Sequence, residues 1–142
     1  MSSFPIIQRT SVVTATSSAD VTLTFGSLPT PGHAVFVAVA MKATLGTEGV
    51  TISDNQSNSY TSEVAPNANN CKAAMAYAYN VAASGTFTIT VHPTGTTQTT
   101  VAEAFEVSGF GTVDPLVGVG TANGLSQKIG RASCRERVWT VV

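Results

Sequence analysis

Side chains able to bind or react gather in one short polar segment, where Asp54 and Asn58 lie four residues apart and Tyr60 follows. Oxygens of this kind can ligate Ca²⁺, which takes six to eight of them, or bond back to local backbone in an Asx turn. The spacing does not match a calcium-loop signature, which favours the plain Asx turn; a Ca²⁺ site completed by Asp114 or Glu106 is the alternative. Asp54, Asn58 and Tyr60 are the candidate ligand-binding residues, with Tyr60 expected to be the best exposed aromatic.

The carboxylates Glu103 and Glu106 are an odd number of residues apart, so in a regular strand they face opposite sides and cannot form a glycosidase pair by themselves. Glu106 shares a face with Ala102 and Ala104, which predicts a partly buried structural carboxylate. Such a group needs hydrogen-bond partners, for example backbone donors of a loop or a Tyr hydroxyl.

The sequence gives little support to catalysis or to a metal site. His33 and His92 stand far apart with no motif around either, and no nucleophile elbow, phosphate-binding loop or H-E-x-x-H pair is present. Cys71 is interpreted as a small buried apolar residue, the alternative being a thiolate activated by a histidine. We therefore expect no enzyme and no metal centre.

Tyr77 and Tyr79 share a face with Met75 and are interpreted as core or inter-sheet packing.

The elements that position these residues are short alternating segments. In residues 19–25 and 86–91, apolar side chains point one way and threonines the other, the period of two of a half-buried strand. Residues 33–41 are apolar on both faces, which predicts a central strand, and residues 6–16 read as one polar, edge-like strand. Residues 99–108 form a further strand.

Two further segments carry alternatives or special geometry. Residues 50–53 and 59–64 are predicted to pair as a hairpin around the 54–58 loop. Residues 71–81 are predicted as a strand whose alanine face packs against the opposing layer, although the run 74–78 also has high helix propensity.

This pattern predicts an all-β fold, an antiparallel β-sandwich of Ig-like or jelly-roll type with about seven to nine strands. One domain is expected over residues 1–127, with 117–127 as a final strand or the start of a linker, and a missing closing strand would leave an edge that invites association. Residues 129–138 resemble the conceptual translation of a sequencing adapter, so 128–142 are interpreted as a non-native tail; a native basic tail is the alternative.

Without that tail the chain has three basic and seven acidic residues, a net charge of −4. This argues against nucleic-acid or anionic-membrane binding. Residues 35–41 are too short to span a bilayer, and no signal peptide is visible at the N-terminus. The weakly charged, Thr- and Ser-rich composition is typical of extracellular or particle-surface β proteins.

Four stretches carry a resemblance: I-S-D-N-Q-S-N-S-Y (52–60), A-Y-A-Y-N-V-A-A-S-G (76–85) with F-T-I-T-V (87–91), F-E-V-S-G (105–109) and D-P-L (114–116). Over residues 5–120 the chain resembles an Ig-like β-sandwich module of bacterial secreted multidomain proteins and phage virion proteins. It departs from that module in having Ser57 in place of Gly and Val107 in place of an aromatic residue.

The resemblance implies an accessory, adhesive or structural role without a reaction. We therefore expect a non-enzymatic structural or adhesion module of a phage virion surface or tail, which associates with itself or with neighbouring domains. The alternative is a carbohydrate-binding accessory domain of a secreted protein, using Tyr60 and the Asn or Asp side chains of its loop.

Overall fold

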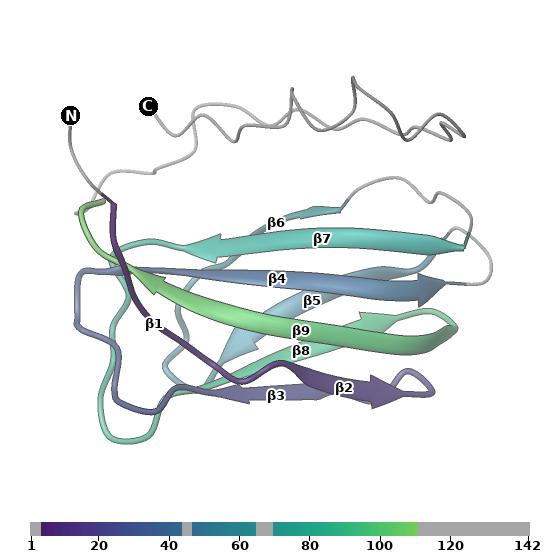
Figure 1. Cartoon of the computed structure of the whole chain (residues 1–142), viewed down its shortest axis with the longest axis horizontal. Coiled ribbons are helices and arrows are strands. Elements are labelled where there is room, and N and C mark those ends of the chain that lie inside the picture. The colour runs from purple at the N-terminus through teal and green to yellow at the C-terminus, as the bar shows by residue number, and fades with distance from the viewer. Residues whose placement is uncertain (1–3, 44–46, 65–69, 111–142) are drawn as a thin grey trace.

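The computed structural model describes residues 4–43, 47–64 and 70–110, and over them the chain is all β (Figure 1). The strands, in chain order, are β1 (Ile6–Arg9), β2 (Val13–Thr16), β3 (Val21–Thr24), β4 (Ala34–Ala43), β5 (Gly49–Asp54), β6 (Thr61–Val64), β7 (Cys71–Ala78), β8 (Thr88–Thr94) and β9 (Thr97–Val107). The predicted fold class is confirmed, and the helix alternative for residues 74–78 is wrong.

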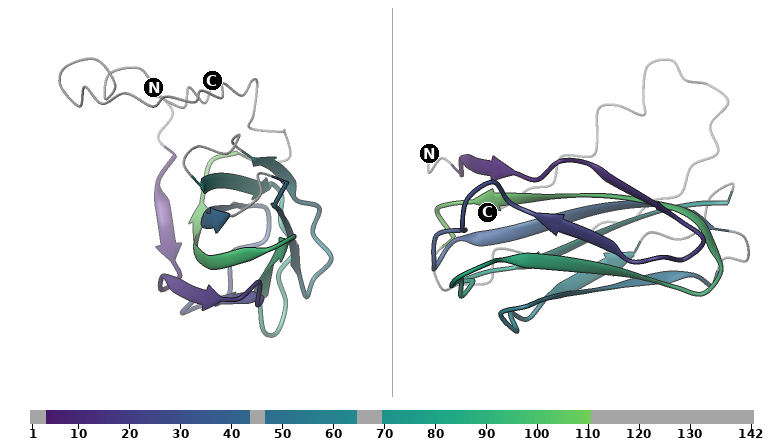
Figure 2. Two further views of the ribbon diagram at one scale, coloured as in Figure 1. Left: turned by 90° about the vertical axis from the view of Figure 1, so that its right-hand side faces the viewer. Right: turned by 90° about the horizontal axis from the view of Figure 1, so that it is seen from below.

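Two antiparallel sheets form the layers of a sandwich. One has the order β1-β9-β4-β7-β6, with β2 also paired to β9, and the other has the order β3-β8-β5. Among the described strands, only the β1–β2 and β6–β7 connections stay within a sheet. This order is that of an antiparallel β-sandwich, the architecture that the two expected types share. Seen end-on, the layers enclose one interior (Figure 2).

The core consists of the inward-facing side chains of the strands in which apolar and polar residues alternate. Leu23 and Ile89, paired in register across β3 and β8, are fully buried, whereas Thr22 between the inward residues is exposed. Facing them, Val35 and Val37 of β4 are also fully buried. As predicted, β4 is central, because it pairs with both β7 and β9.

The first strand differs from its prediction, because residues 6–16 form two strands rather than one. Between them Thr10 turns inward and is buried. Its backbone nitrogen donates to the Ala104 carbonyl at 2.9 Å, and its hydroxyl accepts from the Ala104 nitrogen at 3.0 Å. The Thr10 hydroxyl thus takes the place of a backbone acceptor, and the ladder of backbone hydrogen bonds along β9 is interrupted at Thr10.

The predicted hairpin over residues 50–64 is wrong. β5 pairs with β8, and β6 pairs with β7 in the other sheet. The physical reason is that the intervening residues 55–60 are long enough to cross between layers that lie about 10 Å apart. This crossing places the Asp54 loop at one end of the sandwich.

Candidate functional site at the loop end of the sandwich

Three connections meet at one end of the sandwich: residues 25–33 between β3 and β4, 55–60 between β5 and β6, and 79–87 between β7 and β8 (Figure 1). The predicted residues Asp54, Asn58, Tyr60 and Glu106 all lie at this end. They belong to two separate hydrogen-bond networks, one around Asp54 and one around Glu106.

The Asp54 carboxylate organises the first network. Its Oδ1 accepts from the backbone nitrogens of Gln56 at 2.9 Å and Asn58 at 3.1 Å, and its Oδ2 accepts from Asn58 Nδ2 at 2.8 Å and the Tyr60 hydroxyl at 3.0 Å. This is the expected Asx turn, closed over Ser57, whose φ of 61° lies in the left-handed region that glycine adopts without a Cβ penalty. Both carboxylate oxygens are already used as acceptors.

The structure adds no support for the Ca²⁺ site that is the alternative for this loop. Within the described residues no group of three or more His, Cys, Asp or Glu side chains could hold a metal ion. Asp114, the other proposed ligand, lies outside them.

Asn58 joins the β5–β6 connection to the β7–β8 connection. Its Nδ2 donates to the Ala82 carbonyl at 2.9 Å, and its Oδ1 accepts from the Ala82 nitrogen at 2.7 Å. Asn55 repeats this pattern, because its Nδ2 donates to the Thr86 carbonyl at 2.7 Å and its Oδ1 accepts from the Thr88 nitrogen at 3.0 Å. The polar side chains of the loop therefore fasten two connections together.

Tyr60 differs from the expectation of an exposed ring. It is half-buried, packs against the core and donates its hydroxyl inward to Asp54. Burial raises the pKa of the Tyr60 phenol, and the negative charge of Asp54 and the hydrogen bond to it raise the pKa further. Its role as a ligand-binding residue remains a prediction.

Tyr60 should make the fold sensitive to alkali. Because its pKa is raised in the folded state, the folded chain keeps a proton that the unfolded chain loses above about pH 10, so stability falls as the pH rises past that value. We expect Tyr60→Phe to show a shallower alkaline loss of melting temperature than the wild type. Equal alkaline slopes in the two melting series would contradict this.

Glu106 is the centre of the second network and has an exposed fraction of 1%. Its Oε1 accepts from the Thr30 nitrogen at 2.8 Å and lies 2.6 Å from His33 Nδ1, and its Oε2 accepts from Gln8 Nε2 at 2.6 Å. Glu106 is therefore a buried carboxylate that accepts a hydrogen bond from loop backbone. No Tyr hydroxyl takes part among its described contacts.

The ionised form of Glu106 is favoured despite its burial. Burial acts to raise the pKa of this carboxyl, but hydrogen bonds from Thr30, Gln8 and His33, together with the charge of His33, outweigh it and lower the pKa below its ordinary value. The unfolded chain therefore binds a proton at a higher pH than the folded chain does.

It follows that Glu106 contributes stability above about pH 4.3, the ordinary Glu value, and that this contribution is lost as the pH falls through the lower folded-state pKa. We expect Glu106→Gln to be less stable at neutral pH but to lose less stability on acidification. Melting temperatures measured from neutral to acidic pH check this. Parallel curves for the two proteins would contradict it.

The other candidate residues do not join these networks. Glu103 faces the opposite side of β9 from Glu106, as predicted, and lies 3.9 Å from Arg9. His92 Nδ1 lies 2.7 Å from Asp20 Oδ1, whereas His33 contacts Glu106, so the two histidines are not brought together.

Two predictions on β7 are corrected. Cys71 is exposed rather than buried, because the inward set of this strand is Lys72, Ala74, Ala76 and Ala78. Tyr77 is buried, but it packs on the outer side of the sheet against Phe36 rather than between the sheets. Tyr79 follows the end of β7 and is 38% exposed. The alanine face packs inward as expected.

A small open pocket lies beside the two networks. It has a volume of about 210 Å³ and is lined by residues 24–28 and 85–87. Leu28 at its rim is 43% exposed, while Phe25 and Phe87 form a buried floor with ring centroids 6.2 Å apart. Three of the lining residues carry hydroxyl groups: Thr24, Ser27 and Thr86. The pocket therefore offers an apolar floor with polar groups around it.

Sequence reasoning did not identify Gln8, Thr30 or Asn55 as parts of this end. Gln8 lies 98 residues from Glu106 and contacts Ser27 as well, with its Oε1 accepting from the Ser27 hydroxyl at 2.9 Å. No local pattern marks such a residue, because its role depends on how the sheets are stacked. For Asn55, the Asp- and Asn-rich loop composition was the available signal.

Among the described residues, no helix is long and apolar enough to cross a membrane. Comparisons of the chain with protein-family models, curated proteins and solved structures find no match.

Proposed function

We propose that this chain is a non-enzymatic structural or adhesion module that works through its surfaces, in the setting of a phage virion surface or tail. The observation that carries the proposal is the use of the polar loop side chains. Asp54, Asn58, Asn55 and Glu106 direct their polar atoms at neighbouring backbone and side chains, which stiffens the loop end. A scaffold benefits from this arrangement, whereas a reactive site needs groups aimed at a substrate.

Composition supports the virion setting. The chain before residue 128 is weakly charged and rich in Thr and Ser, as particle-surface β proteins are. In this proposal the module takes no cofactor, and its partners are copies of itself or neighbouring extracellular or virion domains.

A carbohydrate-binding accessory role is the second candidate, and the pocket beside the Asp54 loop favours it. An apolar floor with hydroxyls at the margin suits a sugar ring. Tyr60 could contribute only through its ring, because its hydroxyl is bonded to Asp54.

Two assays test these alternatives. The first is a panel of chromogenic esters and glycosides, with Glu106→Gln as the comparison; turnover lost in this variant would overturn the non-enzymatic proposal. The second is a glycan array with the wild type, Tyr60→Ala and Leu28→Ser. We expect no saturable binding. Saturable binding that either variant abolishes would favour the carbohydrate-binding role, and Tyr60→Phe separates loss of the ring from loss of the hydroxyl.

A further inference from the structure

Exposed apolar side chains gather near the beginning of the described chain. Six large apolar side chains are exposed within the described residues, and four of them are Phe4, Ile6, Ile7 and Val12. Ile6 and Ile7 are 61% and 50% exposed on β1, an edge strand of the larger sheet. Edge strands are commonly protected by charged side chains, and Arg9 is the only charged residue on this strand. Such a gathering of exposed apolar groups indicates a contact surface.

Residues 4–10, which include β1, are attached to the sandwich without sharing its apolar core. None of them belongs to the hydrophobic core, and among the described strands β1 pairs with β9 alone. A register shift between Ile6 and Gln8 interrupts that pairing. Segments with few buried apolar contacts open locally at a lower free energy than the whole fold. Residues 4–10 can therefore leave β9 while the rest of the sandwich stays folded.

The Gln8 side chain fixes the place of this segment on the sandwich. Its Nε2 donates to Glu106 Oε2 at 2.6 Å and to the Ser27 carbonyl at 3.0 Å. Its Oε1 accepts from the Ser27 nitrogen at 3.2 Å and from the Ser27 hydroxyl at 2.9 Å. These directional contacts select a segment with an amide side chain at this position.

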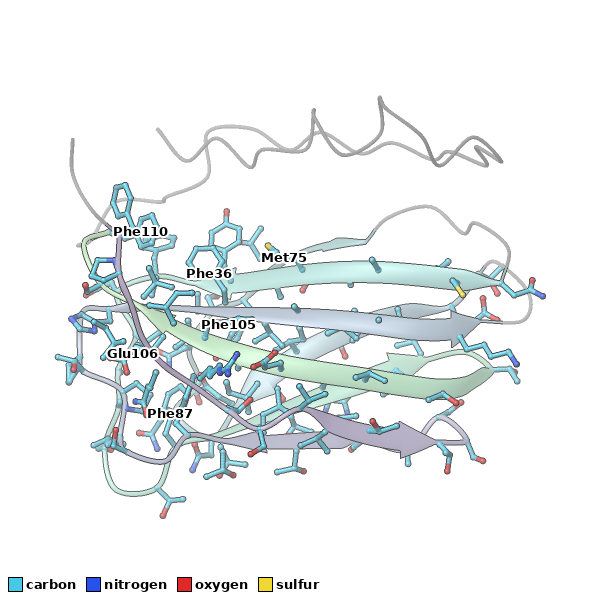
Figure 3. The ribbon with its side chains drawn as sticks, viewed as in Figure 1. Phe36, Met75, Phe87, Phe105, Glu106 and Phe110 are labelled. Atoms are coloured by element: carbon cyan, nitrogen blue, oxygen red, sulfur yellow. The ribbon has the colours of Figure 1, made fainter. Side chains whose placement is uncertain are left out.

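Contacts at both ends of the segment complete its place. The Phe4 ring stacks on Phe110 with centroids 4.6 Å apart, and the Thr10 nitrogen donates to the Ala104 carbonyl at 2.9 Å. In Figure 3, Phe110 and Glu106 mark two of the places along β1 where these contacts lie. All the partners lie outside residues 4–10. The same residues of a second copy would therefore make identical contacts there.

The connection between β1 and β2 is suited to an exchange between copies. Residues 11–12 belong to no strand and are exposed, Val12 by 59%. β1 and β2 both lie on one edge of β9, because β4 occupies the other edge along its length. A turn at residues 11–12 directs the segment to β9 of a neighbouring copy and leaves β2 in place. Exchange of an identical element is a low-cost route to a dimer.

We infer that this chain dimerises by exchanging residues 4–10, so that the segment of each copy pairs with β9 of the other. The closed and exchanged forms make the same contacts along the segment, so they differ at the hinge of residues 11–12. There the exchange brings the exposed Val12 side chains of the two copies together about a two-fold axis. The inference rests on the proposed structural role, in which copies of the chain are partners, and it gives that partner its contact.

A cysteine pair between β1 and β9 tests the exchange. Cys71 and Cys134 are first replaced by Ser, and Arg9→Cys is then combined with Phe105→Cys, because these two residues are partners in register. The reduced protein is incubated over a wide range of concentration, oxidised and analysed by non-reducing gel electrophoresis. We expect covalent dimers whose share rises with concentration, because in the exchanged form each new disulfide joins two chains.

Thr14→Cys with Val101→Cys is the matched control. These residues are partners across β2 and β9, and β2 stays on its own chain, so this pair should give intrachain disulfides alone. Adding Gln8→Ala to the first pair should shorten the time in which covalent dimers appear about tenfold, because it removes the hydrogen bonds to Ser27 and Glu106 that hold the segment. Thermal melting of the reduced proteins shows that each variant is folded.

Intrachain disulfides alone for the Arg9 and Phe105 pair at every concentration overturn the inference. Covalent dimers that form equally with both pairs also overturn it, because the copies then meet by another route. So does an unsubstituted chain that is monomeric at every concentration in sedimentation equilibrium. The glycan and turnover assays do not depend on β1, so a failure of the proposed function is distinguished from a failure of the exchange.

Discussion

Replacing Glu106 by Ala is expected to lower the free energy of unfolding by about 3–5 kcal/mol. The substitution removes the acceptor for Thr30, Gln8 and His33 at a site where the carboxylate is 1% exposed, so water cannot readily replace it. A single domain has a total stability of about 5–15 kcal/mol, so this loss is a large part of the whole. Chemical denaturation monitored by circular dichroism measures it.

Glu103→Ala provides the matched control. Glu103 lies on the same strand but is partly exposed, and its ion-pair partner Arg9 is 3.9 Å away with a side chain that is 73% exposed. A surface ion pair of this kind contributes about 0–1 kcal/mol. Losses of similar size for the two substitutions would show that the buried network does not hold the loop end together.

The second large effect is expected in the core. Leu23→Ala and Ile89→Ala should each lower the free energy of unfolding by about 2–5 kcal/mol, because both side chains are fully buried and their removal leaves a cavity between the sheets. Thr22→Ala, exposed on the same strand, should change it by about 0.5 kcal/mol or less.

The double variant Leu23→Ala with Ile89→Ala tests whether the two side chains pack against each other. Leu23 and Ile89 are paired in register on the same inner face, so their cavities should merge and the two losses should not add independently. Strict additivity in denaturation experiments on the single and double variants would indicate that the two side chains do not share one packing site.

The strands with a strong period of two were predictable from the residues alone. In β3 and in the first half of β8, apolar residues alternate with threonines, and the burial alternates accordingly. Residues 33–41, apolar on both faces, became the central strand β4. Glu106 was predictable as buried because Ala102 and Ala104 share its face. These are local properties, since the pleat alone fixes which side chains share a face.

The pairing of the strands and the contacts between polar groups became apparent only from the tertiary structure. It separated β5 and β6 into different sheets, brought Gln8 to Glu106 and turned the Tyr60 hydroxyl inward to Asp54. It also left Phe36 and Phe105 on an outer face of the sandwich, and alternation alone cannot distinguish an inner apolar face from an outer one. The physical reason is that strand pairing and sheet stacking join residues far apart in the chain, and local sequence patterns do not encode those contacts.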